Sequence, residues 1–129
     1  MRIGEAAQAA GMTSKALRFY EEFGLLPVAE RTANGYRHYT RETINRLDFI
    51  RRGRAAGLAL TQIREILILR DAGRSPCTHV RDLLAGQLAG LDAQIAELVA
   101  LRATVAEYHA VAAAADPDAC DAGRICSYL

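Results

Sequence analysis

The chain has 129 residues, of which 51% are hydrophobic, and a formal net charge of +1. This length supports one modest domain with an extension, but not two full cores. The segment Met1–Glu5 is polar, so we expect no signal peptide, and the apolar stretches all carry Asp, Glu or Arg, so we expect no membrane span. These features predict a soluble protein of the cytoplasm.

The charge is unevenly distributed along the chain. Residues 1–74 carry thirteen Lys and Arg against eight Asp and Glu, whereas residues 75–129 carry three Arg against seven acidic residues. A basic first part and an acidic second part favour a polyanion that binds the first part only. A solvated surface with uneven charge is the alternative interpretation.

The chain opens with a helix-turn-helix pattern. Helical apolar spacing over residues 3–10 is broken by Gly11, and Thr13 or Ser14 is placed to cap a second helix over residues 15–22. Two further helices follow later in the basic part. Thr40 is expected to cap the third, which Gly57 ends, and Thr61 the fourth, which ends at residues 72–73.

A hairpin is predicted between the second and third helices, over residues 28–39. Asn34-Gly35 is a strong short hairpin signal, because both residues tolerate positive φ. The flanking Arg31 and Arg37 suit a wing laid along a DNA backbone. A Tyr-rich hairpin that covers the small core is the alternative, and Tyr39 is the residue best placed for that role.

Beyond residues 73–76, a short Gly/Ser/Pro hinge, one long helix is predicted over about residues 78–115. Its apolar residues step by four, three, four and three, which is a coiled-coil seam: Leu84, Leu88, Leu91, Ile95 and Leu98. A helix this long cannot bury the seam on so small a domain, so we expect a homodimer of antiparallel helices. The alternative is a long helix that folds back and packs on the preceding domain of the same chain.

The three cysteines bracket this helix. Cys77 lies just before it, and Cys120 and Cys126 lie in the tail after Asp116-Pro117, which ends the helix. An odd cysteine count favours free thiols or metal ligands over a disulfide framework. Antiparallel helices would bring Cys77 of one subunit to the tail pair of the other, which predicts a soft-metal site.

These parts resemble the MerR family of bacterial transcriptional regulators, at matching spacing, on four stretches and two single residues: Ile3–Ala7, Thr13–Glu21, Gly24–Pro27, Arg31, Asn34–Arg37 and Tyr39. The resemblance implies a mainly α fold. A winged helix-turn-helix DNA-binding domain (1–73) would precede a hinge and antiparallel coiled-coil dimerisation helix (74–116) and a metal-binding loop and tail (117–129).

The resemblance also implies roles for individual residues. The DNA-binding residues would be Lys15, Arg18, Tyr20, Arg31, Tyr36, Arg37 and Arg54, of which only Arg18 and Lys15 are placed to contact bases. The dimer would bind a palindromic operator in a double-stranded promoter. Metal binding would bend and untwist that DNA so that RNA polymerase can use the promoter. The regulator would therefore affect RNA polymerase indirectly, through the shape of the promoter.

The metal ligands would be Cys77, Cys120 and Cys126, and the effector a divalent soft ion: Hg, Cd, Pb or Zn. The family's Cu(I) sensors carry serine at the position of Cys77. The short spacing between Cys120 and Cys126, and the lack of an adjacent Cys pair, depart from the family pattern and leave the ion open. Asp116, Asp118 and Asp121 are possible oxygen ligands, while His79 is expected at the surface.

Two alternatives stay within the same family: a Cu(I) sensor, and a thiol redox regulator using Cys120 and Cys126. An architectural DNA-binding protein would leave the cysteines without a role. An enzyme is not expected. The sequence has no Ser/His/Asp set, no phosphate-binding Gly loop and no paired carboxylates, and Cys77 with His79 is a poor nucleophile pair.

Overall fold

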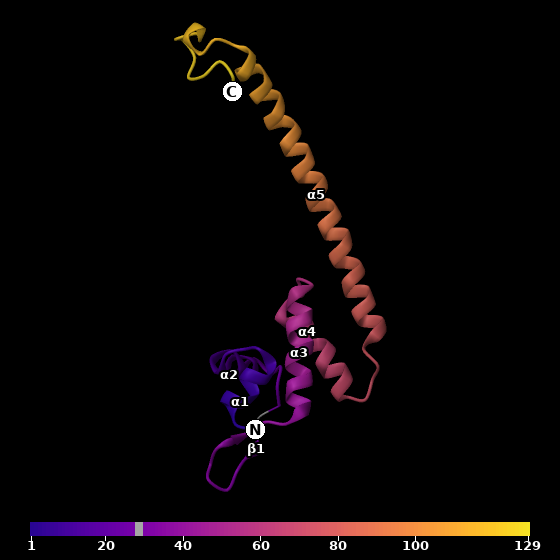
Figure 1. Ribbon diagram of the computed structural model, residues 1–129. Coiled ribbons are helices and arrows are strands. Elements are labelled where there is room, and N and C mark those ends of the chain that lie inside the picture. Colours follow the sequence, from indigo (N-terminus) through magenta and orange to yellow (C-terminus); the bar gives the residue numbers. More distant parts are fainter. Residues whose placement is uncertain (28–29) are drawn as a thin grey trace. The chain divides into compact units, whose positions relative to one another are not determined.

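The computed structural model describes residues 1–27 and 30–129 (Figure 1). Its elements are α1 (Ile3–Ala10), α2 (Ser14–Phe23), β1 (Glu30–Arg31), β2 (Arg37–His38), α3 (Arg41–Ala55), α4 (Leu60–Asp71), α5 (Cys77–Ala114) and the short 3-10 helix η1 (Pro117–Ala119). Residues 28–29, which belong to the predicted wing segment, lie outside the described residues. The chain forms two compact units, residues 1–87 and 88–129, and α5 runs from the first into the second. The predicted fold class, mainly α with a long C-terminal helix, is confirmed.

Side chains near the helix starts explain where the helices begin. Thr13 Oγ1 accepts the Ala16 N–H at 3.1 Å, and Thr40 Oγ1 accepts the Thr43 N–H at 3.4 Å, so both residues are N-caps as predicted. The prediction that Thr61 caps α4 is wrong. The N-cap is Ala59, which makes no side-chain cap hydrogen bond, and the side chain of Gln62 accepts the Ala59 N–H at 2.9 Å.

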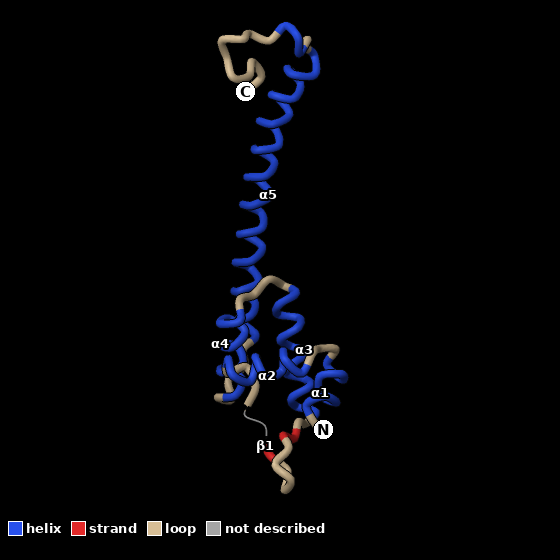
Figure 2. The backbone as a smooth tube through the Cα atoms, turned by 90° about the vertical axis from the view of Figure 1, so that its left-hand side faces the viewer, coloured by secondary structure: helices blue, strands red, loops and turns tan. Residues whose placement is uncertain are grey.

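The hairpin is present, but its loop is longer than a two-residue turn. Glu30 pairs with His38 and Arg31 with Arg37, which leaves residues 32–36 as the loop, drawn between the two red strands in Figure 2. Gly35 adopts a φ of +80°, and the Thr32 N–H donates to the Tyr36 carbonyl at 2.7 Å. Asn34 keeps a negative φ, since only glycines among the described residues have positive φ. The Asn-Gly signal therefore located the hairpin but not its loop type.

The first unit is built around one apolar core. The largest fully buried side chains come from α2, the segment after it, α3 and α4: Leu17, Leu25, Leu47, Ile50, Ile63 and Ile66. Tyr39, at the base of the hairpin, is also buried, as the core-covering interpretation predicts. The first turns of α5 add Val80 and Leu83, both partly buried against this core.

A buried arginine joins three parts of the first unit. The guanidinium of Arg46 donates to the Leu25 carbonyl at 2.9 Å and 3.3 Å and to Asp71 Oδ1 at 2.8 Å. Its side chain is only 7% exposed, and a guanidinium is tolerated at such a site when its N–H groups are paired. Arg46 on α3 thereby fixes both the segment after α2 and the last residue of α4.

The long helix α5 leaves its apolar seam uncovered within one chain. All of its residues are described and none is buried, while Leu88, Ile95 and Leu98 are between 57% and 64% exposed.

By length and composition α5 is able to cross a membrane, so the expectation that no stretch of the chain approaches a membrane span is wrong in that respect. Asp92 and Glu97 nevertheless interrupt its apolar middle, where a charge costs about 3 kcal/mol in a bilayer. The regular seam favours a protein partner.

Replacing Leu47 with alanine tests the core. Leu47 is fully buried, so the truncation is expected to lower the free energy of unfolding by about 2–5 kcal/mol through lost burial and a cavity. Ile68→Ala on α4 is the control, because Ile68 is 57% exposed and its loss should change stability by about 0.5 kcal/mol or less. Urea denaturation followed by circular dichroism measures both, and equal effects would contradict this core.

Candidate nucleic-acid interface and metal-binding tail

Helix α2 presents basic side chains to solvent while its opposite face is anchored in the core. Leu17 is fully buried, which fixes the rotation of the helix about its axis. Lys15 and Arg18 are exposed, and neither has an ion-pair partner among the described side chains of residues 1–27 and 31–129. Two arginine or lysine side chains free of acidic partners on one short helix are suited to nucleic-acid contacts.

The wing is fastened to α2 by a buried carboxylate. Arg37 Nη1 lies 2.9 Å from Glu21 Oε2, and the Tyr39 hydroxyl donates to the same oxygen at 3.3 Å. The Glu21 side chain is only 7% exposed. A hydrogen bond with Tyr39 and the charge of Glu21 raise the pKa of Arg37, and burial raises the pKa of Tyr39. Arg37 therefore stays charged and Tyr39 neutral at physiological pH.

Glu21 is a site residue that the sequence reasoning missed. It follows the buried Leu17 by four residues, a spacing that puts both on one face of a helix. An acidic residue on the inward face needs a cationic or hydroxyl partner, and Arg37 and Tyr39 supply both kinds. That spacing was the available signal.

The other predicted DNA-binding residues have varied surroundings. Arg31 donates to the Gly35 carbonyl at 3.1 Å, across the wing loop. Tyr20 is partly buried against the core, and its ring centroid lies 5.8 Å from that of Phe19. Arg54 is exposed in the last turn of α3.

One hollow brings together predicted residues from separate segments. It has a volume of about 750 Å³, and its lining includes Arg18 from α2, Tyr36 and Arg37 from the hairpin, and Arg2 and Glu5 from the N-terminal segment. Lys15, Arg31 and Arg54 do not line it. The structure thus gathers three of the seven predicted residues around one basic depression.

In the second unit, a hydrogen-bonded loop holds the two tail cysteines. The Asp121 N–H donates to Ser127 Oγ at 3.3 Å, which closes the loop beside Cys120 and Cys126. Asp121 Oδ1 accepts the Gly123 N–H at 2.8 Å, and Asp116 Oδ1 accepts the Asp118 N–H at 3.0 Å. These two carboxylates shape the tail backbone. The two tail thiols are free and exposed.

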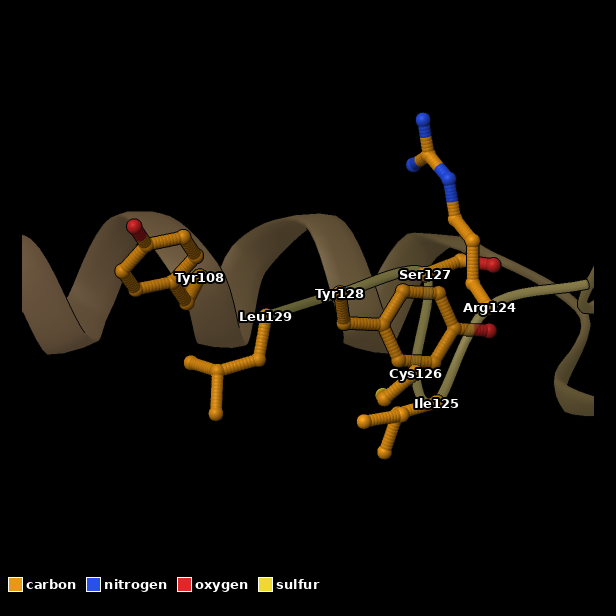
Figure 3. Close-up of a pocket in the computed structure, with 7 residues that line it drawn as sticks. All are labelled: Tyr108, Arg124, Ile125, Cys126, Ser127, Tyr128 and Leu129. Carbon is orange, nitrogen blue, oxygen red and sulfur yellow. The ribbon is translucent and has the colours of Figure 1, made fainter.

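Tyr128 lies next to both tail cysteines. The pKa of Tyr128 is raised by a hydrogen-bonding interaction with Cys120, by desolvation, and by the charges of Cys120 and Cys126. Its hydroxyl is shielded from solvent and has no well-aligned hydrogen-bond partner among the described residues. Tyr108 of α5 and residues 124–129 line a cavity of about 580 Å³ (Figure 3). Cys126 is one of the residues that line this cavity, whereas Cys120 does not line it.

Cys77 is the first residue of α5, and its thiol is free and exposed. His79 turns toward α4, where its Nε2 lies 3.9 Å from Glu65 Oε2. Among the described side chains of a single chain, residues 1–27 and 31–129, no three Cys, His, Asp or Glu gather to form a metal site.

Residues 1–68 match the family described as MerR HTH family regulatory protein, and residues 44–108 match the family described as MerR, DNA binding. The chain belongs to the MerR family. It is therefore a transcription regulator with a DNA-binding helix-turn-helix, not an enzyme, as predicted. The resemblance stated from the sequence is confirmed.

Relatives of this MerR-family chain include metal-dependent regulators. It is 38% identical over 109 residues to a probable heavy metal-dependent transcriptional regulator of Haemophilus influenzae, covering 84% of this chain and 85% of the relative. It is 35% identical over 97 residues to the mercuric resistance operon regulatory protein of Bacillus cereus, covering 75% and 74%.

A solved structure matches the whole chain. The transcription regulator PbrR691 from Ralstonia metallidurans CH34, crystallised in complex with lead(II), is 35% identical and superposes with a TM-score of 0.76. The match covers 100% of this chain and 96% of that one. The chain is accordingly a metal-responsive regulator, and its relatives differ in the metal that their names specify.

Replacing Glu21 with glutamine tests how the wing is held. The variant loses the carboxylate that pairs with Arg37, so the hairpin is expected to open more often and trypsin to cut faster after Arg31 and Arg37. Glu22→Gln is the matched control, because Glu22 is exposed and contributes least to the raised pKa of Arg37. Mass spectrometry of timed digests measures the cleavage, and equal rates in both variants would contradict the proposed fastening.

Proposed function

We propose that this MerR-family protein is a cytoplasmic homodimer that activates heavy-metal resistance or efflux genes when it binds a divalent soft ion: Hg, Cd, Pb or Zn. The observation that carries the proposal is the tail, where a loop closed by the Asp121–Ser127 hydrogen bond carries two free, exposed thiols. Thiolates are soft ligands and select such ions over Mg²⁺ or Ca²⁺.

The third ligand is Cys77, supplied by the partner subunit. One chain offers two thiols in its tail and a single exposed thiol at the start of α5. Three thiolates suit a divalent ion in trigonal or tetrahedral coordination. Asp116 and Asp121 are engaged with backbone N–H groups, and His79 turns toward Glu65, so the thiols are the better donors.

The exposed seam of α5 supports the dimer. Leu84, Leu88, Leu91, Ile95 and Leu98 keep coiled-coil spacing and are each at least 41% exposed. Pairing two seams removes this apolar surface from water, at about 25 cal/mol per Å². An antiparallel pair puts the N-terminal end of one α5 beside the C-terminal end of the other, which is the arrangement that a shared site requires.

On DNA, each protomer would use the basic depression of its first unit. Arg18 and Lys15 would contact base edges, while Tyr36, Arg37, Arg31 and Arg54 would contact phosphates, with Tyr20 supporting α2. Metal binding would alter the hinge between α4 and α5, and the dimer would bend and untwist the promoter. RNA polymerase would respond to the changed promoter spacing.

A thiol redox switch is the second candidate, because Cys120 and Cys126 are free, exposed thiols at the two ends of one hydrogen-bonded loop. A Cu(I) sensor is the third, and it would leave Cys77 without a role. A chelator reverses a metal response, whereas only a reductant reverses a disulfide. This difference separates the candidates.

Mixed dimers test whether the site is shared between subunits. Cys77→Ser homodimers and Cys120→Ser/Cys126→Ser homodimers are both expected to lose three-thiolate binding of Hg(II), Cd(II) and Pb(II). A heterodimer of the two variants retains one complete site only if Cys77 acts on the partner's tail. We expect one ion per heterodimer, measured by chelator competition and by thiolate-to-metal charge-transfer absorption.

Two outcomes would contradict this arrangement. Heterodimers that bind no metal would mean that each site lies within one subunit. Tight Cu(I) binding that Cys77→Ser leaves unchanged would favour a Cu(I) sensor instead. His79→Ala is the control, because it changes a potential ligand two residues from Cys77 and is expected to leave the charge-transfer spectrum unchanged.

Replacing Arg18 with alanine tests the base-reading role. The variant is expected to lose about 1–3 kcal/mol of binding to the duplex that the wild-type protein selects from a randomised pool. Binding to mixed-sequence DNA should fall much less, because phosphate contacts remain. Fluorescence anisotropy on both duplexes measures the ratio, and an equal loss on both would make Arg18 a phosphate contact instead.

A further inference from the structure

Arg2 stacks on the wing residue Tyr36. Its guanidinium carbon lies 4.2 Å from the centroid of the Tyr36 ring, which is the geometry of a cation–π contact. The two residues come from the segment before α1 and from the hairpin loop, and both line the hollow of about 750 Å³ that Arg18 and Arg37 also line. Stacking fixes the plane of the guanidinium and leaves its N–H edge available.

Among the side chains that the structure describes, Arg2 has no acidic partner at the hollow. Glu21 is paired with Arg37, and Glu5 Oε2 accepts the main-chain N–H of Arg2 at 3.2 Å. Within the described residues, no carboxylate forms an ion pair with the guanidinium of Arg2 or with that of Arg18. Two exposed guanidinium groups therefore face one depression with unused donors, an arrangement that suits a phosphate.

We propose that the hollow is a binding site for a DNA backbone phosphate and that Arg2, held by Tyr36, is its principal ligand. The proposal rests on the DNA-binding part of the proposed function and not on metal sensing. Arg2 lies beside the wing and the basic face of α2, so a duplex lying along Arg18 and the wing brings its sugar-phosphate strand to this hollow. A bidentate guanidinium is a strong donor set for phosphate oxygens.

A bracing role is the competing explanation for the stacked pair. If Arg2 only positioned the wing, its loss would weaken DNA binding without changing the number of phosphates neutralised. A phosphate contact is different, because each one releases condensed counterions and adds about 0.9 to the slope of log K against log salt concentration. The salt dependence of binding therefore distinguishes a direct phosphate contact by Arg2 from a role in positioning the wing.

The experiment measures binding of metal-free protein, kept in chelator, to the duplex selected by the wild type, over a series of salt concentrations. Arg2→Ala is expected to weaken binding and to reduce the slope by about 0.9 per protomer. Arg2→Lys keeps the charge, so its slope should stay near that of the wild type while its affinity falls. Tyr36→Leu removes the stacking and should weaken binding, and adding it to Arg2→Ala should cost less than the two separate losses together.

Arg81→Ala is the matched control for net charge. Arg81 is an exposed arginine on α5 near Asp82, so its loss changes the net charge equally but should leave the slope unchanged. An Arg2→Ala slope equal to that of the wild type would overturn the proposal. So would saturable binding of inorganic phosphate that Arg2→Ala abolishes while the DNA slope is unchanged, since the site would then serve a free anion.

Two further readouts keep the result interpretable. Thermal unfolding of Arg2→Ala should match the wild type, because the hydrogen bond to Glu5 uses the main chain of residue 2 and survives the substitution. Failure of the wild-type protein to bind any duplex would overturn the proposed function itself. Binding by the wild type with an unaltered Arg2→Ala slope would overturn only the role of Arg2.

Discussion

The carboxylate of Glu21 is the constraint on which the DNA-binding face depends. It projects from α2 into a nearly dry site and there receives both Arg37 and the Tyr39 hydroxyl. A carboxylate removed from water is costly unless it is paired, so α2 and the hairpin are stabilised in one arrangement. Among the described side chains, the same pairing leaves Arg18 and Arg2 as the arginines at the hollow without acidic partners, and these are the groups available to a polyanion.

The long helix poses the opposite problem, because its apolar seam has no partner in one chain. Its first turns are tied to the first unit by Val80 and Leu83, and the Gln87 side chain donates to the Ala56 carbonyl at 3.0 Å. The remainder of the seam is exposed along every repeat. A second copy of the helix would cover this surface with matching spacing, which is why the proposed metal site and the proposed dimer depend on each other.

The sequence was sufficient for most of the helices because capping and apolar spacing are local. Thr13 and Thr40 act as caps within three residues of the N–H groups they bind, and the seam repeats along a single helix. Features that depend on distant segments were not predictable in this way. The pairing of Glu21 with Arg37, the stacking of Arg2 on Tyr36 and the burial of Arg46 each join residues at least sixteen positions apart. The loop type of the hairpin was not predicted for another reason. The Asn-Gly signal allows positive φ at both residues, whereas only Gly35 adopts it.

The anchoring of α4 restricts how a change at Cys77 can reach the DNA-binding face. Arg46 holds Asp71 and Glu42 holds Arg70, so the end of α4 is fixed to α3 by two ion pairs. The segment of residues 72–76 then lies between this fixed point and Cys77. A displacement of α5 can be absorbed in that segment, or it can be passed on through Gln87 to the turn after α3, where Gly57 adopts a φ of +79° beside the Gln87 side chain. Because a Cβ at position 57 would meet the Gln87 amide, the glycine permits this contact, and the turn between α3 and α4 is a second point, besides the segment of residues 72–76, at which α5 is joined to these helices.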